Sequence, residues 1–180
     1  AKAVTEAEDG STIYVMSNLT MTKCARYYDK DLTITSLNPN DPVTIFRGTE
    51  FDTQNDPRSW YNPALIEVQT KGEAERCGLI LHHIILDDKG LHEGSIFAQA
   101  SSGSGTDQID NTTIVQDAMI ASNATVPCTI TLGEGAILRN FGGMSAVRVT
   151  EKAKLVMESG SKIEDTTVTD RVKGPSGSVG

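Results

Sequence analysis

The chain has 180 residues, of which 38% are hydrophobic and 22% charged, and its formal net charge is −8. This acidic balance opposes binding to nucleic acid or anionic lipid, which requires clustered Lys and Arg. The sequence also contains no apolar run long enough to cross a membrane. We therefore expect no nucleic-acid partner and no membrane insertion.

Short apolar segments that alternate with period two begin near the N-terminus and recur along the chain. Residues 13–15, 32–34, 43–45 and 146–149 are rich in Thr, Val and Ile, which favour strands. Pro and Gly gather between such segments and mark turns. Helical spacing finds little support; its best candidate, 112–124, has no strong caps. The pattern predicts an all-β protein.

One sequence motif occurs twice in the C-terminal half of the chain. TITLGEGAILRNF at 129–141 and KLVMESGSKIEDT at 154–166 match position by position, 25 residues apart. Their shared template is apolar-x-apolar, a turn of small residues, and a second apolar-x-apolar pair. With turns of other lengths the template also fits 13–21, 32–45 and 79–88. An internal repeat of this length is typical of solenoid proteins.

A third predicted strand follows most units, at 64–68, 95–100 and 145–149. Three short strands per repeat are typical of a parallel β-helix, in which each repeat forms one coil. A β-sandwich would not explain the repeat, and the leucine-rich-repeat pattern is absent. We therefore predict a right-handed parallel β-helix, a solenoid of about five coils.

The domain organisation follows from the extent of the repeat. The β-helix domain is expected over 12–170, with loop insertions at 47–63 and 101–127. Residues 1–11 form an N-terminal lead-in. Residues 171–180 form a C-terminal tail that we expect to continue into further coils of a longer protein.

Stacking of the repeats predicts specific neighbours in the core. Ile130 should lie on Leu155 and Leu132 on Met157, because these residues occupy equal positions in successive repeats. The same alignment predicts that four residues are buried and meet across one coil step: Leu132, Leu138, Leu155 and Ile163.

The three cysteines, Cys24, Cys77 and Cys128, show no CxxC spacing, which disfavours a zinc site. Cys77 and Cys128 stand two residues before equivalent strand positions, so they should stack in one column. Parallel side chains in a column do not favour the torsion of a disulfide, and we expect free thiols.

Asp or Asn recurs at one predicted corner. Asp88, Asn140 and Asp165 occupy equivalent positions, where a side-chain oxygen can accept backbone N–H groups as in an Asx turn. Asp87 and Asp88 resemble the paired acids of polysaccharide-cleaving enzymes, but adjacent strand residues point to opposite faces. We predict a structural cap at Asp88 and no catalytic residue in this chain.

No cofactor or metal site is expected. A metal site needs converging ligands, whereas His82, His83 and His92 fall in predicted turns and are interpreted as solvated. Asp107 and Asp110, in the Ser- and Gly-rich insertion, are a weak calcium signal.

The first insertion holds the only aromatic pair that resembles a ligand platform. Trp60 and Tyr61 stand near Asp56 and Arg58, and sugar sites stack a pyranose on such a ring beside polar groups. The alternative is that Trp60 packs onto the coil and orders its own loop, which we favour. These four residues are the candidate ligand-binding residues of the sequence.

Several segments resemble the coils of large adhesin-like cell-surface β-helix proteins of gut Firmicutes, in the pectate-lyase-like superfamily: YDKDLTITSL, GLILHHIILDD, ITLGEGAILRNFGG and AKLVMESGSKIEDTTV. The resemblance covers about residues 12–170 and carries no catalytic signature. It implies an extracellular, noncatalytic adhesin or spacer module that contacts host glycans or surface proteins through its loops. The alternative is a fragment of a carbohydrate-active lyase or hydrolase whose catalytic coils lie outside this chain.

Overall fold

The computed structural model describes residues 2–49, 64–70, 74–90, 118–123, 126–141, 145–149 and 152–166. These residues form short strands, all paired in parallel, and one short helix. The predicted all-β class is confirmed. No helix among the described residues is long and apolar enough to cross a membrane.

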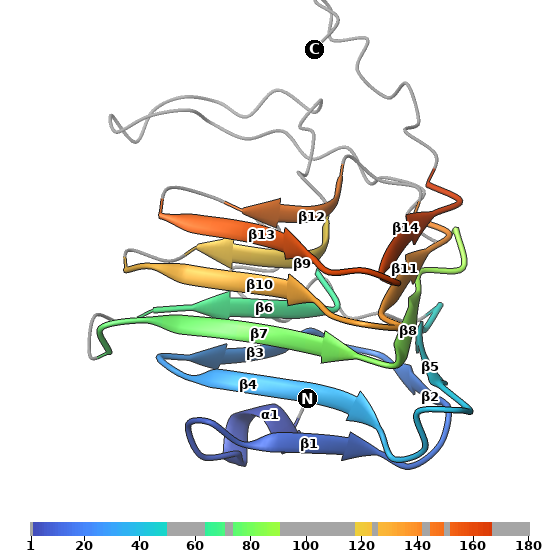
Figure 1. Ribbon diagram of the computed structural model, residues 1–180, viewed down its shortest axis with the longest axis horizontal. Helices are drawn as coiled ribbons and strands as arrows, with labels where there is room; N and C mark the ends of the chain where they lie inside the picture. Colours follow the sequence, from blue (N-terminus) through green and yellow to red (C-terminus); the bar gives the residue numbers. More distant parts are fainter. Residues whose placement is uncertain are drawn as a thin grey trace, which may run out of the picture.

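Within the described residues the strands form three parallel sheets, which we call A, B and C (Figure 1). Sheet A contains, in spatial order, β1 (Thr12–Val15), β4 (Asp31–Ser36), β7 (Cys77–His82), β10 (Cys128–Leu132) and β13 (Ala153–Met157). Sheet B contains β2 (Leu19–Met21), β5 (Val43–Arg47), β8 (Ile84–Asp87), β11 (Ile137–Arg139) and β14 (Lys162–Glu164). Sheet C contains β3 (Ala25–Tyr28), β6 (Ile66–Gln69), β9 (Ala118–Asn123) and β12 (Ser145–Val149).

The chain enters the three sheets in a fixed rotation. It contributes one strand to sheet A, the next to sheet B and the next to sheet C, and then returns to sheet A beside its earlier strand. In Figure 1 the strands of sheet A therefore rise in order from β1 to β13, with sheet C behind and sheet B to the right. Each inner strand thus pairs with the strands one repeat earlier and one repeat later in the sequence, and each edge strand pairs with one of these.

The predicted register of the two matching phrases is confirmed. Ile130 pairs with Leu155 and Leu132 with Met157 between β10 and β13, and Leu138 pairs with Ile163 between β11 and β14. The 25-residue offset read from the sequence is therefore the offset of the hydrogen-bonded ladder. A slip by one residue would turn the apolar set outward, so this register is strongly specified.

The core lies between the three sheets and is built from columns of apolar side chains. Leu32, Leu79 and Ile130 are register partners on successive strands of sheet A, and all three are buried. Leu132 and Leu138 are buried as predicted. Burial of apolar area in such columns supplies the main stabilising term of the fold.

The prediction of burial was wrong for Leu155 and Ile163. Both pack against the core but remain partly exposed. They lie on β13 and β14, and no other strand in the described part of the chain pairs with the far edge of either. A column residue is covered on both sides only when a paired strand lies on each side of its own strand, so the outermost members stay accessible.

The N-terminal lead-in contains the helix α1 (Lys2–Glu6), which the search for strand periodicity did not predict. Val4 is buried against the core, and α1 lies next to β3. The Nζ of Lys30 donates to the carbonyl oxygens of Thr5 at 2.9 Å and Ala7 at 2.6 Å. A lysine at this position satisfies the free carbonyl groups of the last helical turn and complements its dipole.

Sheet C differs most from the strands expected. The strand β3 was not predicted, and β9 lies within the range 101–127 that we expected to be an insertion. The expected strand at 95–100 lies outside the described residues. The sequence of β9, AMIASN, has four apolar residues followed by two polar ones and lacks the period-two alternation that marks a strand.

The bends between strands use left-handed backbone at the predicted positions. Gly135 and Gly160, in the turn between sheets A and B, have φ of 68° and 84°. Asn140 and Asp165, at the end of the following strand, have φ of 56° and 51°. Gly adopts such values without penalty, and Asn and Asp adopt them more readily than other residues.

Candidate functional site

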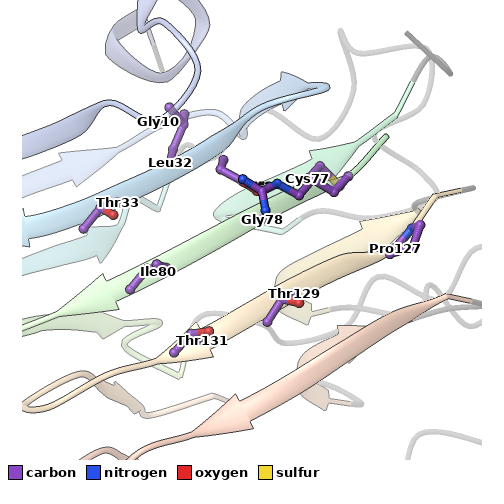
Figure 2. A pocket seen from close by; sticks show the side chains of 11 residues that line it. Gly10, Leu32, Thr33, Cys77, Gly78, Ile80, Pro127, Thr129 and Thr131 are labelled. Atoms are coloured by element: carbon purple, nitrogen blue, oxygen red, sulfur yellow. Dashed lines mark ion pairs between the residues drawn. The ribbon is translucent and has the colours of Figure 1, made fainter. Parts of the chain in front are cut away.

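The ligand-binding residues predicted from the sequence, Trp60, Tyr61, Asp56 and Arg58, lie outside the described residues, as do His92, Asp107 and Asp110. A site must therefore be sought on the sheets themselves. The described residues hold a pocket of about 480 Å³ on the outer face of sheet A (Figure 2). This volume lies within the range of small-molecule sites.

The pocket crosses neighbouring strands of sheet A. Its lining comes from the segment before β1, from the three strands β4, β7 and β10, and from one residue just before β7 and one just before β10. The lining residues are Gly10, Asp31, Leu32, Thr33, Arg76, Cys77, Gly78, Ile80, Pro127, Thr129 and Thr131. Figure 2 shows Gly78 between the labelled side chains, with Thr33, Ile80 and Thr131 on successive strands. The pocket thus spans three neighbouring strands and also follows β7 and β10 from Arg76 to Ile80 and from Pro127 to Thr131.

Two rows of register partners form the floor and walls. Asp31, Gly78 and Thr129 are Cα partners on β4, β7 and β10. Thr33, Ile80 and Thr131 form the next outward row, two residues further along the same strands. Each row therefore presents three side-chain positions at the spacing of parallel strands, about 4.8 Å.

Gly78 creates the depression in this face. A Cβ atom placed on Gly78 would lie 2.8 Å from Oδ1 of Asp31 and 3.0 Å from the carbonyl oxygen of Thr129. The carboxylate of Asp31 leans over the α-carbon of its register partner, and only glycine leaves room for it. A glycine inside a strand often marks such a close approach.

Asp31 is held from several sides. Its carboxylate accepts from Nε of Arg76 at 3.1 Å, and both side chains remain substantially exposed. Its backbone N–H donates to Oδ1 of Asp9 at 2.7 Å, and its carbonyl oxygen accepts from the N–H of Gly10 at 2.8 Å. The acid is thus fixed in position while its pair with Arg76 stays open to solvent.

The interior directly beneath the pocket contains Tyr27 and the stacked pair of cysteines. The hydroxyl of Tyr27 donates to the carbonyl oxygen of Gly78 at 2.7 Å. Burial, with smaller contributions from Cys128, Cys77 and Asp31, raises the pKa of Tyr27 well above its ordinary value. The phenol therefore stays neutral and acts as a hydrogen-bond donor.

Cys77 and Cys128 are register partners, as the repeat predicted, and both are buried as free thiols. The hydrogen bond with Cys128, followed by burial, raises the pKa of the Cys77 thiol. A protonated, buried thiol is a poor nucleophile and a poor metal ligand. We therefore assign these cysteines to packing and not to chemistry.

Of the two adjacent acids at the corner after β8, Asp87 makes an Asx turn that the sequence did not predict: its Oδ1 accepts from the backbone N–H of Lys89 at 2.9 Å. Asp87 also accepts from Arg139 at 2.8 Å and from the amide of Asn140 at 3.0 Å. The cap at Asp88 stays a prediction.

Asp88 forms an ion pair with Arg47 that is almost wholly buried. Arg47 and Asp88 each come directly after one of the register partners Phe46 and Asp87, so the pair joins the ends of the neighbouring strands β5 and β8. The two acids diverge, as expected for neighbouring residues, and each is bound to a different arginine. Neither carboxylate is free to act on a ligand.

The pKa of Asp87 is lower than its ordinary value. Burial alone would raise this pKa, but the hydrogen bonds from Asn140, from the backbone of Lys89 and from Arg139 outweigh it, with help from the positive charge of Arg139. The carboxylate is therefore ionised at neutral pH, and its hydrogen bonds hold the corner after β8 in place.

A third buried acid lies on the outer face of sheet C. Glu67 accepts from Nε of Arg26, its register partner on β3, and from the amide of Gln69. Its side chain is buried. The three buried carboxylates among the described residues are therefore all bound by cationic or amide groups, which fits structural roles.

The two described histidines lie against glycines of the next repeat. A Cβ atom on Gly133 would lie 2.2 Å from the ring of His82, and one on Gly135 would lie 2.7 Å from the ring of His83. His83 occupies the bend between β7 and β8, where its φ is 45°. The part of the chain that the structure describes holds no group of three or more His, Cys, Asp and Glu side chains that could bind a metal.

The residues of the pocket were not predicted as a site. One signal was present: Gly78 interrupts the period-two pattern of a segment that is otherwise strongly apolar. Comparisons of the chain with known protein families, with curated proteins and with solved structures found no match.

Proposed function

We propose that the chain is a right-handed parallel β-helix of about five coils, and that it serves as a noncatalytic extracellular module of a larger bacterial cell-surface protein. The fixed rotation of strands through sheets A, B and C supports the coil arrangement. Connections between parallel strands of one sheet are almost always right-handed, which supports the hand.

The noncatalytic role rests on one observation. Asp87 and Asp88 are the only adjacent acids that sequence reasoning linked to polysaccharide cleavage, and each is bound to an arginine. Cleavage by paired carboxyl groups needs two that converge on a substrate, roughly 5–10 Å apart. Two acids that diverge and are already paired do not meet this requirement.

The resemblance to adhesin-like β-helix proteins of gut Firmicutes supports the cellular setting. In this proposal the stacked coils act as a spacer, and they present binding surfaces to host glycans or to surface proteins. The expected loops at 47–63 and 101–127 are one such surface. The outer face of sheet A, with its pocket and the half-buried threonines that line it, is a second.

A binding assay combined with a cleavage assay tests this function. The chain is applied to an array of glycans and mucins, and in parallel it is incubated with polygalacturonate and with uncharged polysaccharides. We expect retention on the array without release of reducing ends or unsaturated products. Product release that grows with the amount of protein would contradict the noncatalytic role and favour the enzyme alternative.

A further inference from the structure

The charges of the sheet A pocket favour a ligand without net charge. Asp31 and Arg76 are the only charged residues of its lining, and they form an ion pair. The carboxylate of Asp31 would repel an anionic ligand, and the guanidinium of Arg76 would repel a cationic ligand. An uncharged polar ligand can use both, because Asp31 offers strong acceptors and Arg76 strong donors.

The remaining lining alternates hydroxyl groups with apolar surface. Thr33, Thr129 and Thr131 each bring a hydroxyl that can donate and accept. Ile80, which is 38% exposed, and Pro127 offer apolar surface beside them. Hydroxyl groups next to apolar patches match a sugar ring, which carries hydroxyls on its rim and C–H groups on its faces.

The extent of the pocket favours a chain of sugars over a single ring. Its lining includes β4, β7 and β10, and these strands lie about 4.8 Å apart, so it extends across about 10 Å of the sheet. Along β7 and β10 it runs from Arg76 to Ile80 and from Pro127 to Thr131, about 13 Å at about 3.3 Å per residue. The hydroxyl groups lie on β4 and β10, on either side of Ile80, so a linear oligosaccharide can reach both groups while a single ring cannot.

The floor of the pocket is held in place before any ligand arrives. The N–H of Gly78 donates to the carbonyl oxygen of Lys30 at 3.1 Å, and its carbonyl oxygen accepts from Tyr27. The flanking strands are paired on both sides. A site whose backbone is already ordered avoids much of the entropy that binding otherwise costs.

From these observations we infer that the sheet A pocket binds an uncharged oligosaccharide. Asp31 and Arg76 hydrogen-bond one sugar, and the threonines of β10 hydrogen-bond the next, with Ile80 against a C–H face. The inference deepens the proposed function, on which it rests, by naming a site and a ligand class for it.

The test uses the full chain and immobilised hexasaccharides. The uncharged probes are cellohexaose, mannohexaose and galactohexaose, and the acidic probe is hexagalacturonate. The pocket variants are Arg76→Gln and Thr131→Val, which alter exposed or half-exposed side chains. The matched controls are Lys23→Gln and Thr20→Val, at exposed positions beside sheet B. A thermal melt confirms that each variant folds as the wild type does.

We expect the wild type to retain at least one uncharged hexasaccharide in preference to hexagalacturonate. Each pocket variant should weaken that retention about fivefold, the size of one lost hydrogen bond, and both controls should leave it unchanged. A third variant, Gly78→Ala, should abolish retention by displacing the carboxylate of Asp31.

Three results would overturn the inference: no retention of an uncharged probe, preference for hexagalacturonate, or retention by the pocket variants equal to that of the wild type. Cleavage of a retained probe is a separate result. It would refute the noncatalytic role while leaving the pocket assignment standing, so the two failures can be told apart.

Discussion

The hydroxyl of Tyr27 on sheet C donates to the carbonyl oxygen of Gly78 on sheet A, at 2.7 Å. This hydrogen bond crosses the interior and connects the core to Gly78. Gly78 has no side chain, and the pocket on the outer face lies above it. Tyr27 is 1% exposed, so no water competes for its hydroxyl. The shape of the outer face therefore depends on a side chain that lies inside the stack.

Tyr27→Phe should lower the free energy of unfolding by about 1–2 kcal/mol, because the carbonyl of Gly78 loses a donor in a buried place. Denaturation in urea measures this change. Tyr14→Phe is the control, since Tyr14 is 58% exposed, and its effect should stay within about 0.5 kcal/mol. Equal stability of the wild type and Tyr27→Phe would show that this bond contributes nothing to stability.

Arg47→Met should cost about 3–5 kcal/mol, because it leaves the buried carboxylate of Asp88 without its cation. Removing Asp88 as well, in Arg47→Met/Asp88→Leu, should restore part of the loss. Arg76→Met breaks the exposed pair with Asp31 and should cost at most about 1 kcal/mol. If the two single variants unfold at the same urea concentration, burial does not distinguish the two pairs.

Acid should destabilise the protein partly through Asp87. The folded pKa of this residue is lower than its ordinary value of 3.8, so on acidification the unfolded chain takes up the proton first. The contribution of Asp87 to the free energy of unfolding is complete at pH values above its pKa in the unfolded chain. It is lost as the pH falls through its pKa in the folded protein. Unfolding measured from pH 6 to about 2 should therefore show Asp87→Asn converging on the wild type at low pH.

The control for this pH series is Asp41→Asn, at an exposed turn position. A constant gap between Asp87→Asn and the wild type at every pH would contradict the assigned role of Asp87.

All three cysteines should titrate as free thiols in the unfolded protein. In the folded protein, Cys24 should react first, because Cys77 and Cys128 are buried and the pKa of Cys77 is raised by its hydrogen bond to Cys128 and by burial. A thiol reagent followed by mass analysis of peptides gives both results. Recovery of one thiol instead of three from the unfolded chain would reveal a disulfide between Cys77 and Cys128.

The ladder of the core was predictable because one physical constraint sets it. Ile130 and Leu155 pair across β10 and β13 as their sequence positions require, since only that register turns the apolar columns inward. The column of Cys77 and Cys128 follows from the same constraint. Periodicity therefore predicts the strands and their neighbours, but it does not fix where each strand ends, and so it did not predict the Asx turn of Asp87.

The pocket could not be predicted in this way, because outward positions are not constrained by the core. Arg76 and Asp31 stand 45 positions apart in the sequence and have no shared pattern that links them. Their meeting depends on the rotation of the chain through sheets B and C between β4 and β7. The helix α1 was missed for a related reason: it is too short to show a 3.6-residue period.

Hydrogen exchange of the full chain, with and without the uncharged hexasaccharide that it retains, locates the contact without any substitution. We expect slower exchange in peptides that cover Asp31–Ser36, Cys77–His82 and Cys128–Leu132, the strands that line the pocket. Peptides from 47–63, which contain Trp60 and Tyr61, should exchange at the same rate in both states. If only peptides from 47–63 or 101–127 exchange more slowly and the three strands do not change, the sheet A pocket is not the binding site. Binding would then be assigned to the segments expected as loops.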